Sequence, residues 1–180
     1  LPLEGEKNIV HYALYKKPWQ YDDVMDEYFH GFFISSINVS EDNPYYSSEN
    51  GVLYNKDKTQ LIKYPYCKSD KSFVIPDTVV KISTNSMQNY FLEELTIGAS
   101  LESVSYYLQG GYFCYLENLT TINVSKYNKN FVSSDGVLFN ADKTELMCYP
   151  KAKEGESYVI PDGVTIIASR AFCDTEIESV

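Results

Sequence analysis

Few residues of this 180-residue chain belong to the types that carry out catalysis. The sequence has two histidines, His11 and His30, and both lie within its first 30 residues. The spacings of a zinc protease, a serine-hydrolase elbow, a phosphate-binding loop and a dinucleotide-binding turn do not occur in it. Cys67 and His30 have the residue types of a nucleophile and its base, but nothing in the sequence brings them together. We therefore predict that the chain is not an enzyme and has no cofactor.

The four cysteines do not follow the spacing of a metal site or a disulfide framework. They are Cys67, Cys114, Cys148 and Cys173, and no CxxC pair occurs among them. An internal repeat with an offset of 85 residues, described below, keeps no cysteine in both copies. A structural zinc site or a set of disulfides needs its ligands preserved. We predict free thiols, most of them buried, with one disulfide as the alternative.

Two short segments place oxygen-bearing side chains at alternate positions. They are Asn-x-Asp-x-Thr at residues 55–59 and again at residues 140–144. This pattern resembles part of a calcium loop, but it lacks the glycine and the bidentate glutamate that complete one. Lysines inside both segments also oppose cation binding. We predict polar hairpin tips and no metal site.

The charge of the chain excludes two classes of partner. Its formal net charge is −10, so its surface repels nucleic acid and anionic lipid headgroups. No apolar run approaches the roughly 20 residues needed to cross a bilayer. We expect neither nucleic-acid binding nor membrane insertion.

A long internal duplication shows how these residues are positioned. Residues 51–76 recur without a gap as residues 136–161, which is an offset of 85. The match extends back to residues 37–40 and forward to Val79 and Ile82, which correspond to Val164 and Ile167. Each copy contains two strand-like segments around a polar tip, at residues 52–54 and 61–64 in the first copy. We predict a β-hairpin inserted in each copy.

A smaller module lies inside this duplication. An aromatic residue or Met is followed by three aliphatic residues, the last two of which read as a short strand. The instances are Phe29-Ile34-Ile37-Val39, Met87-Leu92-Leu95-Ile97 and Phe113-Leu119-Ile122-Val124. The strand ends at residues 39, 75, 97, 124 and 160 are spaced by 36, 22, 27 and 36 residues. Coils of about 22 residues bury one layer each and must stack, and the spacings of 36 contain the hairpins.

These motifs resemble the BspA-type leucine-rich repeats of bacterial and protist surface proteins. The motifs that carry the resemblance are LxxLxI at residues 92–97, IPDxVxxI at 75–82 and 160–167, Ala171-Phe172, and the insert at 135–144. The resemblance covers about residues 28–180; Met87 and residues 98–100 depart from the family pattern. It implies a secreted, extracellular or cell-surface protein that takes part in adhesion or recognition.

We predict an α/β repeat fold, a leucine-rich-repeat solenoid with short parallel strands on its concave face and β-hairpin insertions. Residues 1–30 form an N-terminal capping region, and residues 31–180 form the solenoid, continuing or truncated at the C-terminus. Residues 177–180 begin a coil without completing it. This predicts self-association through the open C-terminal edge, or truncation.

The outward side chains of the predicted strands form the first candidate binding surface, since solenoids commonly bind partners on the concave sheet. Its residues are Asn38, Val74, Glu94, Thr96, Thr121, Asn123 and Val159. Tyrosines of the insertions form a second candidate, although such tyrosines more often pack half-buried. They are Tyr45, Tyr46, Tyr106 and Tyr107. The predicted function is binding of an extracellular protein or glycan; the alternative is a spacer or accessory domain of a larger surface protein or carbohydrate-active enzyme.

Overall fold

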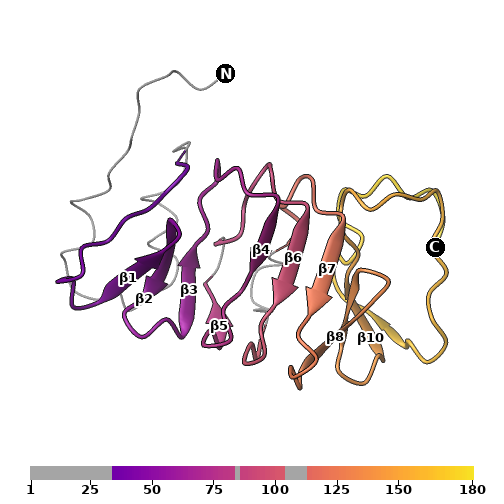
Figure 1. Ribbon diagram of the computed structural model, residues 1–180. Coiled ribbons are helices and arrows are strands. Elements are labelled where there is room, and N and C mark those ends of the chain that lie inside the picture. Colours follow the sequence, from indigo (N-terminus) through magenta and orange to yellow (C-terminus); the bar gives the residue numbers. More distant parts are fainter. Residues whose placement is uncertain (1–33, 84–85, 104–112) are drawn as a thin grey trace.

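The computed structural model describes residues 34–83, 86–103 and 113–180. These residues form an elongated stack of coils, with successive turns of the chain lying side by side (Figure 1). Their strands are β1 (Tyr46–Glu49), β2 (Val52–Asn55), β3 (Gln60–Lys63), β4 (Ser72–Val74), β5 (Lys81–Ile82), β6 (Glu94–Ile97), β7 (Thr121–Val124), β8 (Phe131–Ser134), β9 (Val137–Asn140), β10 (Glu145–Cys148) and β11 (Ile166–Ile167). The predicted capping region, both histidines and the tyrosines at 106 and 107 lie outside the described residues.

A parallel sheet of β4, β6 and β7 runs through the middle of the stack (Figure 1). Ser72 pairs with Glu94, and Glu94 pairs with Thr121. Neighbouring coils are therefore offset by 22 and 27 residues, which confirms these two predicted spacings. The inward residues of β6, Leu95 and Ile97, are fully buried, as the strand alternation requires.

A second parallel pairing joins the coils at another corner. Strand β3 pairs with β5, where Leu61 lies opposite Ile82, and Lys81 of β5 bridges to Ser103 in the following coil. The duplication repeats the arrangement, because β10 pairs in parallel with β11. Each coil is thus held to its neighbours at several places by backbone hydrogen bonds.

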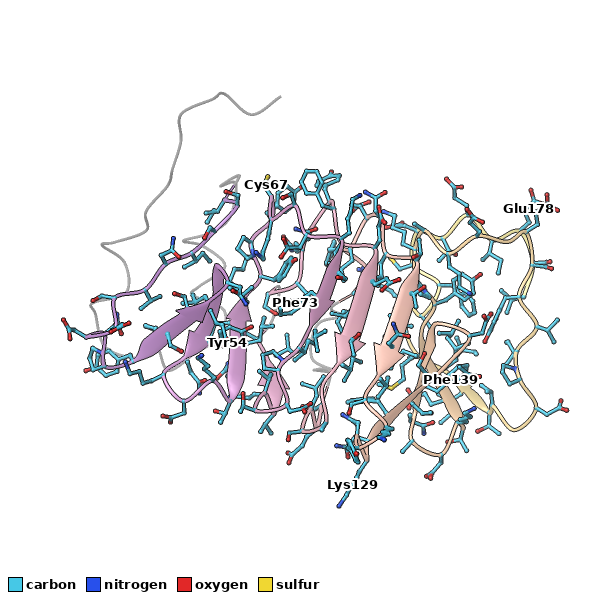
Figure 2. The ribbon with its side chains drawn as sticks, viewed as in Figure 1. Tyr54, Cys67, Phe73, Lys129, Phe139 and Glu178 are labelled. Atoms are coloured by element: carbon cyan, nitrogen blue, oxygen red, sulfur yellow. The ribbon has the colours of Figure 1, made fainter. Side chains whose placement is uncertain are left out.

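The insertions are built into this stack. The predicted hairpins are confirmed, since β2 pairs antiparallel with β3 and β9 with β10. The sequence interpretation missed the preceding strands β1 and β8, which extend each hairpin to three strands. Tyr54 and Phe139, which correspond in the duplication, are buried in the two insertion sheets (Figure 2). The insertions therefore supply core side chains as well as surface.

The predicted α/β class is wrong for the described residues, which contain eleven strands and no helix. The reason is visible between β4 and β6. Val79 donates to the Pro76 carbonyl across a tight turn, β5 follows at once, and the Ser86 carbonyl accepts the N–H of Tyr64 in the preceding coil. A helix needs a run of residues bonded four positions apart. Here turns and bridges to neighbouring coils use those backbone groups.

The C-terminal coil differs from its equivalent in the first copy. Ile82 is 4% exposed, whereas Ile167, at the same place in the second copy, is 44% exposed. Ile82 has a further coil beside it at Ser103, while Ile167 lies in β11, which pairs only with β10 among the described strands. Stacking, and not the local sequence, decides how deeply this position is buried.

Candidate functional site

The structure places five of the seven predicted surface residues on the sheet of β4, β6 and β7. Val74, Thr96 and Asn123 form one row across the three strands, in register. Glu94 and Thr121 lie in a second row. Val74 is 61% exposed, and the other four are exposed or half-buried. This surface is small, polar and mildly acidic.

Asn38 and Val159 do not belong to that sheet. Asn38 is exposed and lies outside the strands, next to Ile37, whose N–H donates to the Gly51 carbonyl at 2.8 Å. Val159 is 86% exposed and follows a bridge between Ser157 and Ser179. Turns of the insertion sheets, and not further strands, lie beside the outer coil strands. Among the described residues, the row of outward side chains is therefore limited to the three strands β4, β6 and β7.

Aromatic residues of three neighbouring coils lie where the chain enters the three strands. They are Tyr66, Tyr90, Phe91 and Tyr115, and we call this group the aromatic edge. The rings of Tyr66 and Tyr90 meet edge to face with centroids 5.1 Å apart. Tyr90 is 47% exposed, Phe91 38% and Tyr115 44%. Cys67, the residue after Tyr66, lies at this margin of the stack, and Lys129 lies at the opposite margin (Figure 2).

One buried asparagine positions the aromatic edge. Asn89 is completely buried, and its Nδ2 donates to the carbonyls of Pro65, Tyr66 and Lys68 at 2.9, 3.1 and 2.9 Å. Its Oδ1 accepts the N–H groups of Phe91 and Leu92 at 2.7 and 2.8 Å. The backbone N–H of Asn89 also donates to the Tyr115 carbonyl at 3.2 Å. Asn89 therefore ties together the backbones of the three coils that carry the aromatic side chains.

Charged residues continue the edge along the following coils. The Nζ of Lys151 lies 2.5 Å from Oε2 of Glu117 and 3.9 Å from Oδ2 of Asp174. The hydrogen bond to Glu117 raises the pKa of Lys151. Burial, together with a hydrogen bond to Tyr90, raises the pKa of Tyr66 to about 12, so this phenol is neutral at physiological pH. The edge thus offers flat ring faces beside a network of paired charges.

The sequence interpretation missed this edge. Its signal was present, because Tyr66, Tyr90 and Tyr115 recur at about one coil length. Of the tyrosines predicted from the insertions, Tyr45 is 37% exposed and Tyr46 is buried.

The described cysteines are free, and Cys114 and Cys148 are buried. Burial raises the pKa of the Cys67, Cys114 and Cys148 thiols, the opposite of what an activated nucleophile requires. Within residues 34–83, 86–103 and 113–180, no group of three or more His, Cys, Asp or Glu side chains could hold a metal ion.

In the two Asn-x-Asp-x-Thr segments, the Asn and Thr side chains hydrogen-bond within the hairpin. Asn55 Oδ1 accepts the Gln60 N–H at 2.9 Å, and Asn55 Nδ2 donates to Thr59 Oγ1 at 2.8 Å. Asn140 and Thr144 repeat the same bond in the second copy at 2.9 Å. These contacts fix the tips of the hairpins.

Nothing in the described part of the chain forms a helix able to cross a membrane.

These features define a solenoid of stacked β coils with an exposed aromatic edge. No family model and no curated protein matches the sequence. Two solved structures are similar in part. The pneumococcal vaccine antigen PcpA is 25% identical in sequence, and the match covers 74% of this chain and 29% of the PcpA chain. A leucine-rich repeat protein from Eubacterium ventriosum is 19% identical, and the match covers 78% of this chain and 45% of that chain.

This chain spans less than half the length of either structure. Both TM-scores are 0.45, too low to establish a shared fold. The resemblance to BspA-type repeats therefore stays a hypothesis based on the sequence motifs.

Proposed function

We propose that this chain is a non-enzymatic recognition module at the cell surface, which binds an extracellular protein or glycan through the aromatic edge. The observation that supports this is the exposure of Tyr90 and Tyr115, at 47% and 44%, together with the ring contact of Tyr90 with Tyr66. Tyrosine rings bury a large area on contact, and their hydroxyls remain able to hydrogen-bond a partner. Tyrosine is also among the residues that contribute most to binding energy at interfaces.

The competing surface is the sheet of β4, β6 and β7. Its exposed row, Val74, Thr96 and Asn123, has no aromatic anchor among its members. The alternative function, a spacer, requires stacked coils but has no use for adjoining exposed rings. The cell-surface location rests on the resemblance of the repeat motifs to BspA-type proteins.

The test is to apply the folded chain to arrays of extracellular glycans and matrix proteins, with heat-unfolded chain as the control. The proposal predicts saturable binding to one class of ligand, lost on unfolding. Binding to matrix proteins alone identifies a protein partner, and binding to glycans alone identifies a carbohydrate partner. If folded chain binds neither array above the unfolded control, the recognition function is wrong and the spacer is favoured.

A further inference from the structure

Three cysteines that are distant in sequence lie together at one end of the stack. The thiol of Cys114 donates to the Arg170 carbonyl at 3.5 Å. The backbone N–H of Cys173 donates to that same oxygen at 3.0 Å. Besides burial, the neighbouring Cys173 thiol raises the pKa of Cys114, and both of these thiols add to the effect of burial in raising the pKa of Cys148.

We propose that Cys114 and Cys173 form a reversible disulfide, and so provide a redox-controlled cross-link between two coils of the solenoid. The Cys114 thiol and the Cys173 backbone N–H donate to the same Arg170 oxygen, at 3.5 and 3.0 Å, which holds the two residues close enough for side-chain rotation to bring their sulfurs together. Cys148 is the less suitable partner, because it is buried and its thiol donates to the Tyr149 carbonyl at 3.7 Å.

The position of the two sulfurs determines the order of the reaction. Cys173 is half-exposed, whereas Cys114 is buried, so an oxidant reaches Cys173 first. With a low-molecular-weight disulfide as oxidant, the Cys173 thiolate attacks one of its sulfurs, forms a mixed disulfide and releases one small thiol. The Cys114 thiolate then attacks the Cys173 sulfur and displaces the second small thiol. Two protein thiols are oxidised, one small disulfide is reduced to two thiols, and the two protons of the protein thiols pass to those products.

We expect the second attack to be the slower step. Burial raises the pKa of Cys114 to about 12, so only a small fraction of it is thiolate at neutral pH. The rate of closure should rise about tenfold for each pH unit in the range below that pKa. On the outside of a cell, where disulfides persist, the bond would stay closed; in a reducing compartment it would open.

The test uses the reduced 180-residue chain incubated with glutathione disulfide. The proposal predicts that the free-thiol count falls from four to two, and that non-reducing peptide mapping finds Cys114 joined to Cys173. Cys67→Ser is the matched control and should form the same bond. Cys173→Ser should remain uncross-linked under the same conditions.

Four outcomes would overturn the proposal: four free thiols remaining, a stable glutathione adduct without a cross-link, a cross-link containing Cys148, or one containing Cys67. The peptide map of the wild-type chain decides the pairing by itself, so poor folding of a variant does not prevent the test. Because the readout is covalent, it is also independent of whether the chain binds any ligand.

Discussion

Replacing Asn89 by Ala should cause a large loss of stability, because its side chain joins neighbouring coils. The substitution removes three donated and two accepted hydrogen bonds from a completely buried position. A buried polar group left without a partner costs about 1–3 kcal/mol, although water entering the cavity would recover part of this. We expect a loss of about 3–5 kcal/mol, against a total stability of about 5–15 kcal/mol for a typical domain. Urea denaturation followed by circular dichroism measures the free energy of unfolding.

Asn118→Ala is the matched control. Asn118 also donates across coils, to the Tyr90 carbonyl, but its contact is exposed. Its removal should cost about 0.5 kcal/mol or less. Asn89→Asp should cost at least as much as Asn89→Ala at pH 7, because it places a carboxylate beside three carbonyl oxygens. Equal stability of the Asn89→Ala and Asn118→Ala variants would refute the coil-joining role.

Three further predictions concern the duplication and the aromatic edge. Ile82→Ala should lower the free energy of unfolding by about 2–4 kcal/mol, and Ile167→Ala by less than half as much, because these side chains are 4% and 44% exposed. Equal losses of stability in urea titrations would contradict the unequal burial of the two positions. Gly136→Ala should lower the stability by about 1–3 kcal/mol, because Gly136 has a φ of 74° and an added Cβ would lie 3.3 Å from Thr121. Gly163→Ala tests the backbone strain alone, because Gly163 has a φ of 93° and open space around it. In thermal melts the first loss of stability should exceed the second. Folding raises the pKa of Tyr66 from 10.0 to about 12, so between these pH values the folded state retains a proton that the unfolded chain loses. The free energy of unfolding should therefore fall as the pH rises from 10 to 12, and Tyr66→Phe should reduce this fall. An unchanged pH profile in the variant would count against this.

The sequence predicted the repetitive part of the fold well, because that part depends on local patterns. Alternating aliphatic residues such as Leu95 and Ile97 had to point inward, and the spacing of their modules gave the offsets between coils. The absence of helices in the described residues was not foreseen. Residues 86–93, for example, are enough for about two helical turns, but their backbone groups bond to neighbouring coils, which a local pattern does not reveal.

The aromatic edge escaped prediction for a related reason. Tyr66 and Tyr90 are 24 positions apart, and their contact depends on the pairing of Tyr64 with Met87 and on the bonds of the Asn89 side chain to the coil before it. A search restricted to strand residues could not find it. Strand β1 was missed because its sequence, YSSE, is mostly polar and lacks an apolar alternation.

The most direct test of the proposed function compares two surfaces in one binding assay. The ligand found on the arrays would be titrated against wild-type chain, an edge variant (Tyr90→Ser with Tyr115→Ser) and a sheet variant (Val74→Ser with Thr96→Ala). The four substituted residues lie within the described part of the chain, as do Asn123 and Tyr66, which both variants leave unchanged. Two aromatic anchors contribute about 1–2 kcal/mol each, so the edge variant should bind at least about tenfold more weakly, while the sheet variant should change by about twofold or less. Full affinity in the edge variant together with a loss of binding in the sheet variant would contradict the assignment of the binding site to the aromatic edge.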